Sequence, residues 1–290
     1  MFWMIFTLIA IIVYGLIFGS FINAVIWRIH QQDVSSSLGL KSKQENNSKN
    51  KVSLSIISGR SICPNCRHIL SPRDLVPVFS WVILRGKCRY CKTKISWQYP
   101  VIEILTAVIF AGYYLFWPYT LIGYGLILFI LSLLIVVGFI ALAIYDLKWF
   151  ILPSRIIYTT LIFIIIYRLV LILWQHQVLS SLFNIFWGII IGGGLFYFIY
   201  LISKGKWIGY GDIRLGALIG VLIGGPLDSI IFLFLASLLG SLVSIPLLVF
   251  KKYHKDSIIP FGPFLILATF IIQLFGVVII HFAKNYYLLP

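Results

Sequence analysis

Two aspartates, Asp146 and Asp212, are the side chains best suited to do chemistry in this sequence. The chain of 290 residues holds only eight acidic side chains, and each of these two interrupts an apolar stretch. A charge at membrane depth is costly, so an ionisable residue there is a functional candidate by default. Asp146 follows the apolar run 136–145 and precedes a Leu-Pro break, whereas Asp212 ends a Gly-Tyr-Gly-Asp sequence. Both are candidates for a reaction at the edge of a membrane.

Two carboxyl groups held close together can act as an acid and a base at the same time. Like charges at close range cannot both ionise readily, so near neutral pH one group keeps its proton. Such a pair can activate water and protonate a leaving group, which is the chemistry of aspartic peptidases and needs no metal. We expect Asp146 and Asp212 to be the catalytic pair. Because Asp146 ends a helix and Asp212 begins one, the helix dipoles predict that Asp146 more often holds the proton.

Asp212 also has a structural interpretation, because Asp is a favoured helix N-cap and glycines often precede helices. The apolar segment that follows it, residues 213–225, has only 13 residues. A helix of that length spans about 20 Å, less than the roughly 30 Å of a hydrocarbon core. The short segment therefore predicts that Asp212 lies below the membrane surface, which favours a functional role.

Four cysteines form two short pairs, Cys63-Pro-Asn-Cys66 and Cys88-Arg-Tyr-Cys91. Each pair places two sulfurs on one tight turn, and two such pairs are typical of four thiolates around a tetrahedral zinc ion. A closed set of four thiolates indicates a structural zinc site, since a catalytic zinc usually keeps a position open for water. Two disulfides, or a redox-active pair, are the alternatives.

The elements that carry these residues are apolar enough to cross a membrane. The chain is 61% hydrophobic and 11% charged, and its formal net charge is +15. Thirteen of its 23 Lys and Arg residues fall between residues 28 and 94, and most of the others lie in short polar breaks. Basic residues in short loops mark the cytosolic side. The charge is thus accounted for by membrane topology, and no nucleic-acid partner is expected.

The apolar runs predict an all-α polytopic membrane protein with about eight transmembrane helices and an N-terminus outside the cell. We expect residues 1–27 to be the first helix, 28–98 a cytosolic loop domain with the zinc site and a mobile part at 31–60, and 99–290 a seven-helix membrane aspartic peptidase domain. The eight runs are residues 2–27, 100–117, 119–145, 156–174, 182–203, 213–225, 227–250 and 258–282.

An ordered set of short sequences carries a family resemblance. Over nearly its full length the chain resembles the type IV prepilin peptidases, also called leader peptidase and N-methyltransferase enzymes. The landmarks are Gly19-Ser20-Phe21-Ile22-Asn23 with Arg28, the two cysteine pairs, Ile95-Ser96, Tyr99-Pro100 leading to Glu103, Asp146 with Leu152-Pro153, Gly209-Tyr210-Gly211-Asp212 with Leu215, and Pro260-Phe261-Gly262-Pro263-Phe264.

The resemblance implies an eight-span protein of the bacterial inner membrane whose two aspartates cleave a short basic leader from type IV prepilin or pseudopilin substrates at the cytosolic face. In many members it also implies N-methylation of the new N-terminus with S-adenosylmethionine. Membrane lipid is the other expected partner. The chain departs from the family pattern at Gln98, where Arg is common, at Ser154, where an acidic or amide residue often stands, and at Arg214, where Lys is usual.

Three other interpretations fit part of the sequence. A presenilin-like protease shares the Tyr-Asp and Gly-x-Gly-Asp pair, but the cysteine pairs and the lack of a Pro-Ala-Leu sequence argue against it. A proton-coupled transporter would place paired acids near the bilayer midplane, whereas these lie at one face. A non-enzymatic assembly scaffold would tolerate the loss of both aspartates. Glu103 is expected to form a structural ion pair with a basic residue of the loop domain.

Overall fold

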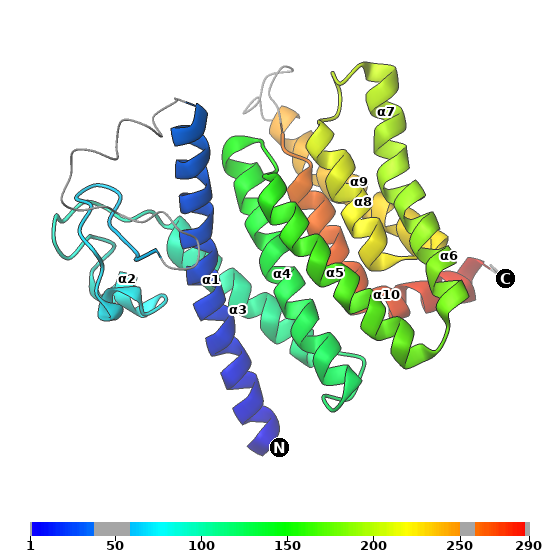
Figure 1. Ribbon diagram of the computed structural model, residues 1–290, viewed down its shortest axis with the longest axis horizontal. Coiled ribbons are helices and arrows are strands. Elements are labelled where there is room, and N and C mark those ends of the chain that lie inside the picture. Colours follow the sequence, from blue (N-terminus) through cyan, green and yellow to red (C-terminus); the bar gives the residue numbers. More distant parts are fainter. Residues whose placement is uncertain (1, 38–58, 250–258, 288–290) are drawn as a thin grey trace. The chain divides into compact units, whose positions relative to one another are not determined.

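The computed structural model describes residues 2–37, 59–249 and 259–287, and within these ranges the regular elements are helices (Figure 1). Two isolated β-bridges, Ile62 with Ile69 and Lys87 with Lys94, are the only extended pairings there. The elements are α1 (Phe2–Ser37), the 3₁₀ helix η2 (Pro72–Leu75), α2 (Phe79–Ile83), α3 (Gln98–Leu115), α4 (Tyr124–Trp149), α5 (Ser154–Gln175), α6 (Val178–Ile189), the π-helical turn η3 (Ile190–Gly194), α7 (Leu195–Ser203), α8 (Tyr210–Ile223), α9 (Pro226–Val249) and α10 (Gly262–Tyr287).

Six helical spans in the described part of the chain are long and apolar enough to cross a membrane. They comprise α1, α3, α4, α5, the continuous run α6–η3–α7, and α9. The predicted all-helical membrane class is therefore confirmed, whereas the predicted count of eight is not. Helix α8 has 14 residues, and Gly224, with a φ of +63°, ends it. The described apolar stretch of α10, Gly262–Gly276, is also shorter than a full span.

Contacts within the chain separate two compact units, residues 1–115 and 116–290. The predicted domain boundaries, at 27/28 and 98/99, stay a prediction. Helix α1 continues to Ser37, so residues 31–37 of the segment expected to be mobile are helical. The rest of that segment as far as residue 58, and the basic break at 251–257, lie outside the described residues.

In the first unit, α1 and α3 pack along each other through glycines of α1. A Cβ atom at Gly15 would lie 2.5 Å from the Ala107 Cα, and one at Gly19 would lie 2.5 Å from the Glu103 Cα. Small residues at such positions let two membrane helices approach at backbone distance. Gly19, the glycine of the first landmark sequence, thus has a packing role.

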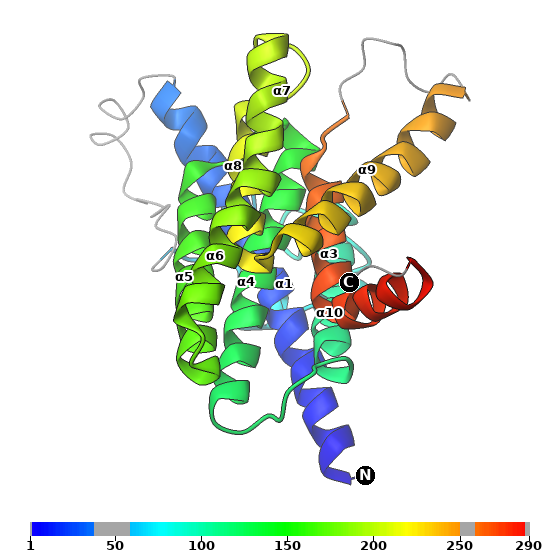
Figure 2. The same ribbon diagram turned by 90° about the vertical axis from the view of Figure 1, so that its right-hand side faces the viewer.

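In the second unit, α8 is surrounded by other helices. It packs against α5, α6, η3 and α10, and Leu215 and Ile219 are fully buried (Figures 1 and 2). Glycines allow the closest of these contacts, because Cβ atoms at Gly220 and Gly216 would collide with the backbone carbonyl oxygens of Gly188 and Gly192. The short helix that carries Asp212 is therefore held by backbone-to-backbone packing over two turns.

Candidate functional site

Asp146 lies in the last turn of α4 and is buried, with 6% of its surface exposed. The helix ends because Phe150 adopts a left-handed conformation (φ 55°) and its N–H donates to the Asp146 carbonyl oxygen at 2.9 Å. The Asp146 carboxylate accepts a hydrogen bond from the Gly262 N–H at the start of α10. A Cβ atom at Gly262 would lie 2.5 Å from the Asp146 Oδ2. The site therefore needs a residue without a side chain at position 262.

Asp212 lies in the first turn of α8, but it is not the N-cap. Gly209 occupies the N-cap position, with the extended backbone typical of that site, and Asp212 follows three residues later. The Asp212 carboxylate accepts a hydrogen bond from the Gly209 N–H, and the Asp212 N–H donates to the Gly209 carbonyl oxygen at 3.2 Å. The carboxylate is thus held by one backbone donor, as a residue at the third position of a helix often is.

The structure brings the two predicted aspartates together. The Asp146 carboxylate lies within electrostatic range of Asp212, although 66 residues separate them in the sequence. The end of α4 and the start of α8 lie at the same end of the second unit, where the α4–α5 and α7–α8 connections also lie (Figure 1). Two carboxyl groups held close together can share protons as a coupled pair, which is the arrangement predicted from the sequence.

The structure weakens the argument from helix dipoles that Asp146, rather than Asp212, more often holds the proton. It relied on the C-terminal dipole of α4, which disfavours an anion at Asp146. The hydrogen bond from the first residue of α10 adds the N-terminal dipole of a second helix, which favours an anion at the same carboxylate. The two dipoles oppose each other, so the assignment of the proton to Asp146 stays a prediction.

The four cysteines form the second predicted site, in the first unit. Their Sγ atoms all lie within 4.8 Å of one another, and the Sγ atoms of Cys63 and Cys91 are 3.8 Å apart. Four sulfurs at about 2.3 Å from a tetrahedral zinc ion would be about 3.8 Å apart. The described residues therefore fit a four-thiolate metal site, and the cysteines are free of disulfide bonds.

The two cysteine pairs have the same local structure. In each pair the first cysteine's carbonyl oxygen accepts a bond from the residue four positions later, Arg67 or Lys92, and that residue has a positive φ. Both turns are closed by an isolated β-bridge. Hydrogen bonds with Thr93 lower the pKa of the Cys91 thiol to about 5. A hydrogen bond with the His68 backbone lowers the pKa of the Cys66 thiol, but burial and hydrogen bonds with Cys63 and Cys91 outweigh it and raise that pKa to about 11. A metal ion binds thiolates, so its binding would release protons from this cluster.

Polar contacts join the cysteine loop to the helices of the first unit. The buried Glu103 carboxylate accepts a hydrogen bond from the Val78 N–H at 2.7 Å rather than forming the expected ion pair with a basic side chain. The ion pair in this loop instead joins the Arg89 Nε to the Asp74 Oδ1 at 2.6 Å. Burial of the Asp74 carboxyl opposes ionisation, but hydrogen bonds from Arg89 and Ser71 outweigh it and lower its pKa.

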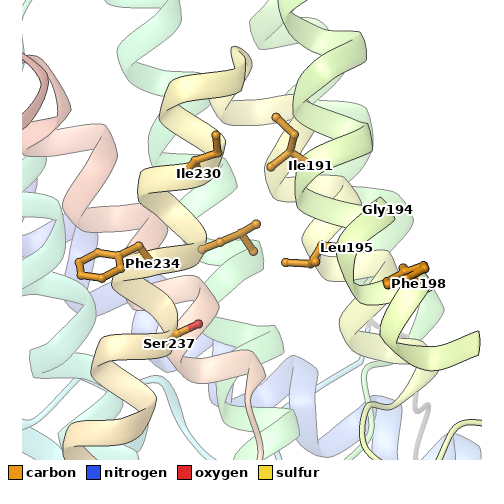
Figure 3. A pocket seen from close by; sticks show the side chains of 8 residues that line it. Ile191, Gly194, Leu195, Phe198, Ile230, Phe234 and Ser237 are labelled. Carbon is orange, nitrogen blue, oxygen red and sulfur yellow. The ribbon is translucent and has the colours of Figure 1, made fainter. Parts of the chain in front are cut away.

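A groove of about 660 Å³ lies between the η3–α7 segment and α9 (Figure 3). Its lining is apolar apart from Ser237, and it includes no titratable side chain. Acid–base chemistry needs groups that exchange protons, so this groove is not the catalytic site. Its residues are Ile191, Gly194, Leu195, Phe198, Ile230, Leu233, Phe234 and Ser237.

Fold and sites together define a class of protein: a multi-pass helical membrane protein with two carboxylates paired at helix ends and a separate cluster of four thiols. The family model described as "Bacterial Peptidase A24 N-terminal domain" matches residues 13–117, and the model "Type IV leader peptidase family" matches residues 133–245. No solved structure is significantly similar to the chain.

Curated relatives agree with both family models. A "Type 4 prepilin-like proteins leader peptide-processing enzyme" of Escherichia coli O78:H11 is 33% identical over 86% of this chain and 87% of its own length. Two proteins named "Prepilin leader peptidase/N-methyltransferase" are also similar. The one from Bacillus subtilis is 32% identical over 79% of this chain and 87% of its own, and the one from Aeromonas hydrophila is 28% identical over 94% and 92%. The chain belongs to the type IV prepilin leader peptidase/N-methyltransferase family.

Two residues near the paired aspartates had no predicted role. Gly262 was noted only as part of a landmark sequence, and Arg214 only as a departure from the family pattern. A glycine directly before a proline at the start of an apolar run is a signal that backbone approaches another group closely, but it does not say which group.

Proposed function

We propose that this protein is a membrane aspartic endopeptidase that removes the leader peptide of type IV prepilin-like proteins, with Asp146 and Asp212 as its catalytic residues. The observation that carries the proposal is that these two carboxylates, from helices far apart in sequence, lie within electrostatic range of each other in a protein of the prepilin leader peptidase family. Each carboxylate keeps a backbone N–H partner, from Gly262 or Gly209, which fixes its orientation.

The proposed reaction uses the pair as acid and base. The ionised carboxylate takes a proton from a water molecule as the water oxygen attacks the scissile carbonyl carbon, and the protonated carboxyl donates to the carbonyl oxygen. When the carbon–nitrogen bond breaks, one proton passes from the pair to the leaving amine, and a hydroxyl group of the tetrahedral intermediate returns a proton to the pair as the new carboxyl group forms. Two products form from one peptide and one water, and the pair returns to its singly protonated state.

The proposed orientation places this chemistry at the cytosolic face of the bacterial inner membrane, with the N-terminus outside. Lys148, Arg155, Lys204 and Lys206 flank the α4–α5 and α7–α8 connections, at the end of the second unit where the aspartates lie. Short loops rich in Lys and Arg stay in the cytosol. A leader awaiting cleavage there would reach the pair without crossing the membrane.

The proposed metal is zinc, held by Cys63, Cys66, Cys88 and Cys91. A closed set of four thiolates stabilises a loop and leaves no position for a water molecule, so the ion would be structural. Prepilins or pseudopilins are the proposed protein partners, with membrane lipid around the helices. The relatives' names also include N-methyltransferase activity. S-adenosylmethionine-dependent methylation is a further proposed activity of this chain, and none of the described residues is assigned to it.

Cleavage of a prepilin-like substrate in isolated membranes tests the proposal. We expect Asp146→Asn and Asp212→Asn each to lower the rate by at least about a thousandfold, because the amide can neither accept nor donate the proton as required. Asp33→Asn is the matched control, since it makes the same change at an exposed position of α1 and should cut at the native rate.

Protein levels and thermal unfolding of all variants exclude a loss of fold. If either active-site variant cleaves at the native rate, the catalytic assignment is wrong. An assembly scaffold would tolerate both changes, and a transporter would lose proton movement across vesicles instead of cleavage.

A further inference from the structure

Arg214 makes a set of contacts that the catalytic pair itself does not explain. It lies two residues after Asp212 in α8, and side chains two apart on a helix point to different faces. Its Nη1 donates to the Ser154 Oγ at 2.8 Å, and its Nη2 donates to the Leu152 carbonyl oxygen at 3.2 Å. Its guanidinium carbon also lies 5.3 Å from the centre of the Tyr210 ring. Two hydrogen bonds and one ring contact therefore fix the position of the Arg214 guanidinium group.

Both acceptors belong to the segment that follows Asp146. Helix α4 ends at Trp149, and the chain then passes through Phe150 to Pro153 before α5 begins at Ser154. This stretch is outside regular structure, so its carbonyl groups need partners from elsewhere. Arg214 supplies one to Leu152. It thereby ties the start of α8 to a segment only a few residues from Asp146.

A second contact joins the same two segments. Gly211, the residue before Asp212, packs on Leu152, and a Cβ atom at Gly211 would lie 3.1 Å from the Leu152 Cδ1. Leu152 is itself buried. The first turn of α8 thus lies directly on the α4–α5 connection, with the apolar contact at Gly211 and the polar contact at Arg214.

From this geometry we propose that Arg214 is a positioning residue for the peptidase reaction: by bridging α8 to Leu152 and Ser154, it fixes the separation of Asp146 and Asp212. The proposal rests on the proposed function. The backbone donors on the two carboxylates are Gly262 and Gly209, whereas the Arg214 donors with partners point to Leu152 and Ser154. Arg214 therefore acts through the backbone and not on the reacting atoms.

Steady-state cleavage by membrane-embedded variants tests this role. A displacement of about 1 Å at a catalytic group can lower a rate about a hundredfold. We expect Arg214→Ala to lower kcat by about ten- to a hundredfold with KM and the pH profile of kcat unchanged, because the side chain meets neither substrate nor proton. Lys206→Ala, at an exposed lysine before α8, is the control and should match the native enzyme.

A double variant at positions 214 and 154 tests whether activity is lost because the aspartates are displaced or because the protein unfolds. In Arg214→Lys, a single ammonium group replaces the guanidinium group that makes both hydrogen bonds, so we expect this variant to lose most of the cleavage activity. Adding Ser154→Asp provides a charged acceptor for that ammonium, and the double variant should be several times more active than Arg214→Lys alone. Ser154→Asp alone keeps the arginine bridge and should remain active.

Hydrogen exchange measured by mass spectrometry gives a readout that does not need cleavage. In Arg214→Ala, we expect faster exchange of amides in residues 150–156 and 210–214 and unchanged exchange in the rest of α4 and in α9. If exchange there is unchanged, or if Arg214→Ala cleaves at the native rate, the positioning role is wrong even when the aspartates prove catalytic. If the native chain cleaves nothing, the proposed function fails while the exchange result still decides whether the bridge exists.

Discussion

At the scale of single residues, the site depends on backbone donors. The Asp146 and Asp212 carboxylates accept hydrogen bonds from the Gly262 and Gly209 N–H groups. At Gly262 the lack of a side chain is essential, because a Cβ atom there would lie 2.5 Å from the Asp146 Oδ2. The position of a backbone N–H is fixed by the chain, so it orients a carboxylate more strictly than a side-chain donor on a flexible stem would. The aspartates are the proposed reacting groups, and the backbone donors beside them orient their oxygens.

Gly262 offers a test at this scale. The Cβ atom of Gly262→Ala would press on the Asp146 Oδ2, the free end of a side chain that can turn away, so the fold should survive while the carboxylate leaves its position. We expect kcat to fall by about ten- to a hundredfold with little change in the unfolding temperature. Gly276→Ala is the control on the same helix, because among the described side chains its Cβ would meet only Ile272, at an ordinary 3.4 Å. Equal activity of the two variants would contradict the role of Gly262.

At the scale of elements, α8 is positioned by glycine contacts with the helix beside it. The run α6–η3–α7 faces α8 through Gly188, Gly192 and Gly193, opposite Gly220, Gly216 and Ala217. Membrane helices lack a hydrophobic driving force between them, so close van der Waals packing of this kind largely determines how they associate. The π-helical turn η3 falls within this contact, where an extra residue in the turn changes which side chains face α8.

The Gly220 contact gives a stability prediction. A Cβ atom there would collide with the Gly188 backbone, which cannot move as a side-chain end can. We expect Gly220→Ala to destabilise the protein by about 1–3 kcal/mol, the usual cost of overpacking a close contact. Thermal unfolding in detergent measures it. Gly194→Ala is the matched control, since its Cβ would face the groove with its nearest neighbour at 3.9 Å and should leave the midpoint unchanged.

At the scale of the whole molecule, the two predicted sites belong to different compact units. The cysteine cluster lies within residues 1–115 and the paired aspartates within residues 116–290. The N-terminal family model ends at residue 117, close to the division between the units. We therefore expect that the proposed metal site in one unit and the proposed reaction in the other can be perturbed separately.

Metal removal tests this separation. We expect a strong chelator, or the Cys66→Ser and Cys91→Ser double variant, to release about one zinc ion per chain and to expose residues 59–97 to protease, because a small loop held by thiolates loses its fold without the metal. Hydrogen exchange in α8 should stay the same. Metal analysis and limited proteolysis measure the first two effects. A purified native chain without bound metal, or a loop that resists protease after chelation, would contradict the zinc site.

The sequence by itself determined the features that depend on residue type and local spacing. Each of these features is a pattern within a few turns of one helix or loop, so it can be recognised in the sequence. They are the two aspartates, the two cysteine pairs, the apolar runs and the short segment after Asp212. The family resemblance rests on the order of such patterns, and it is confirmed by the family models and relatives.

Only the tertiary structure decided how these patterns meet. Four features were not predicted. Helix α1 continues to Ser37, and Gly209 rather than Asp212 is the N-cap of α8. The Gly262 N–H donates to the Asp146 carboxylate, and Arg214 bridges α8 to Leu152. Contacts such as the one between Arg214 and Leu152 join residues about sixty positions apart. Which of many apolar helices pack together depends on the fit of their surfaces and not on hydrophobicity, which they all share. The candidate reacting groups can therefore be identified in the sequence, whereas the helix packing that positions them cannot.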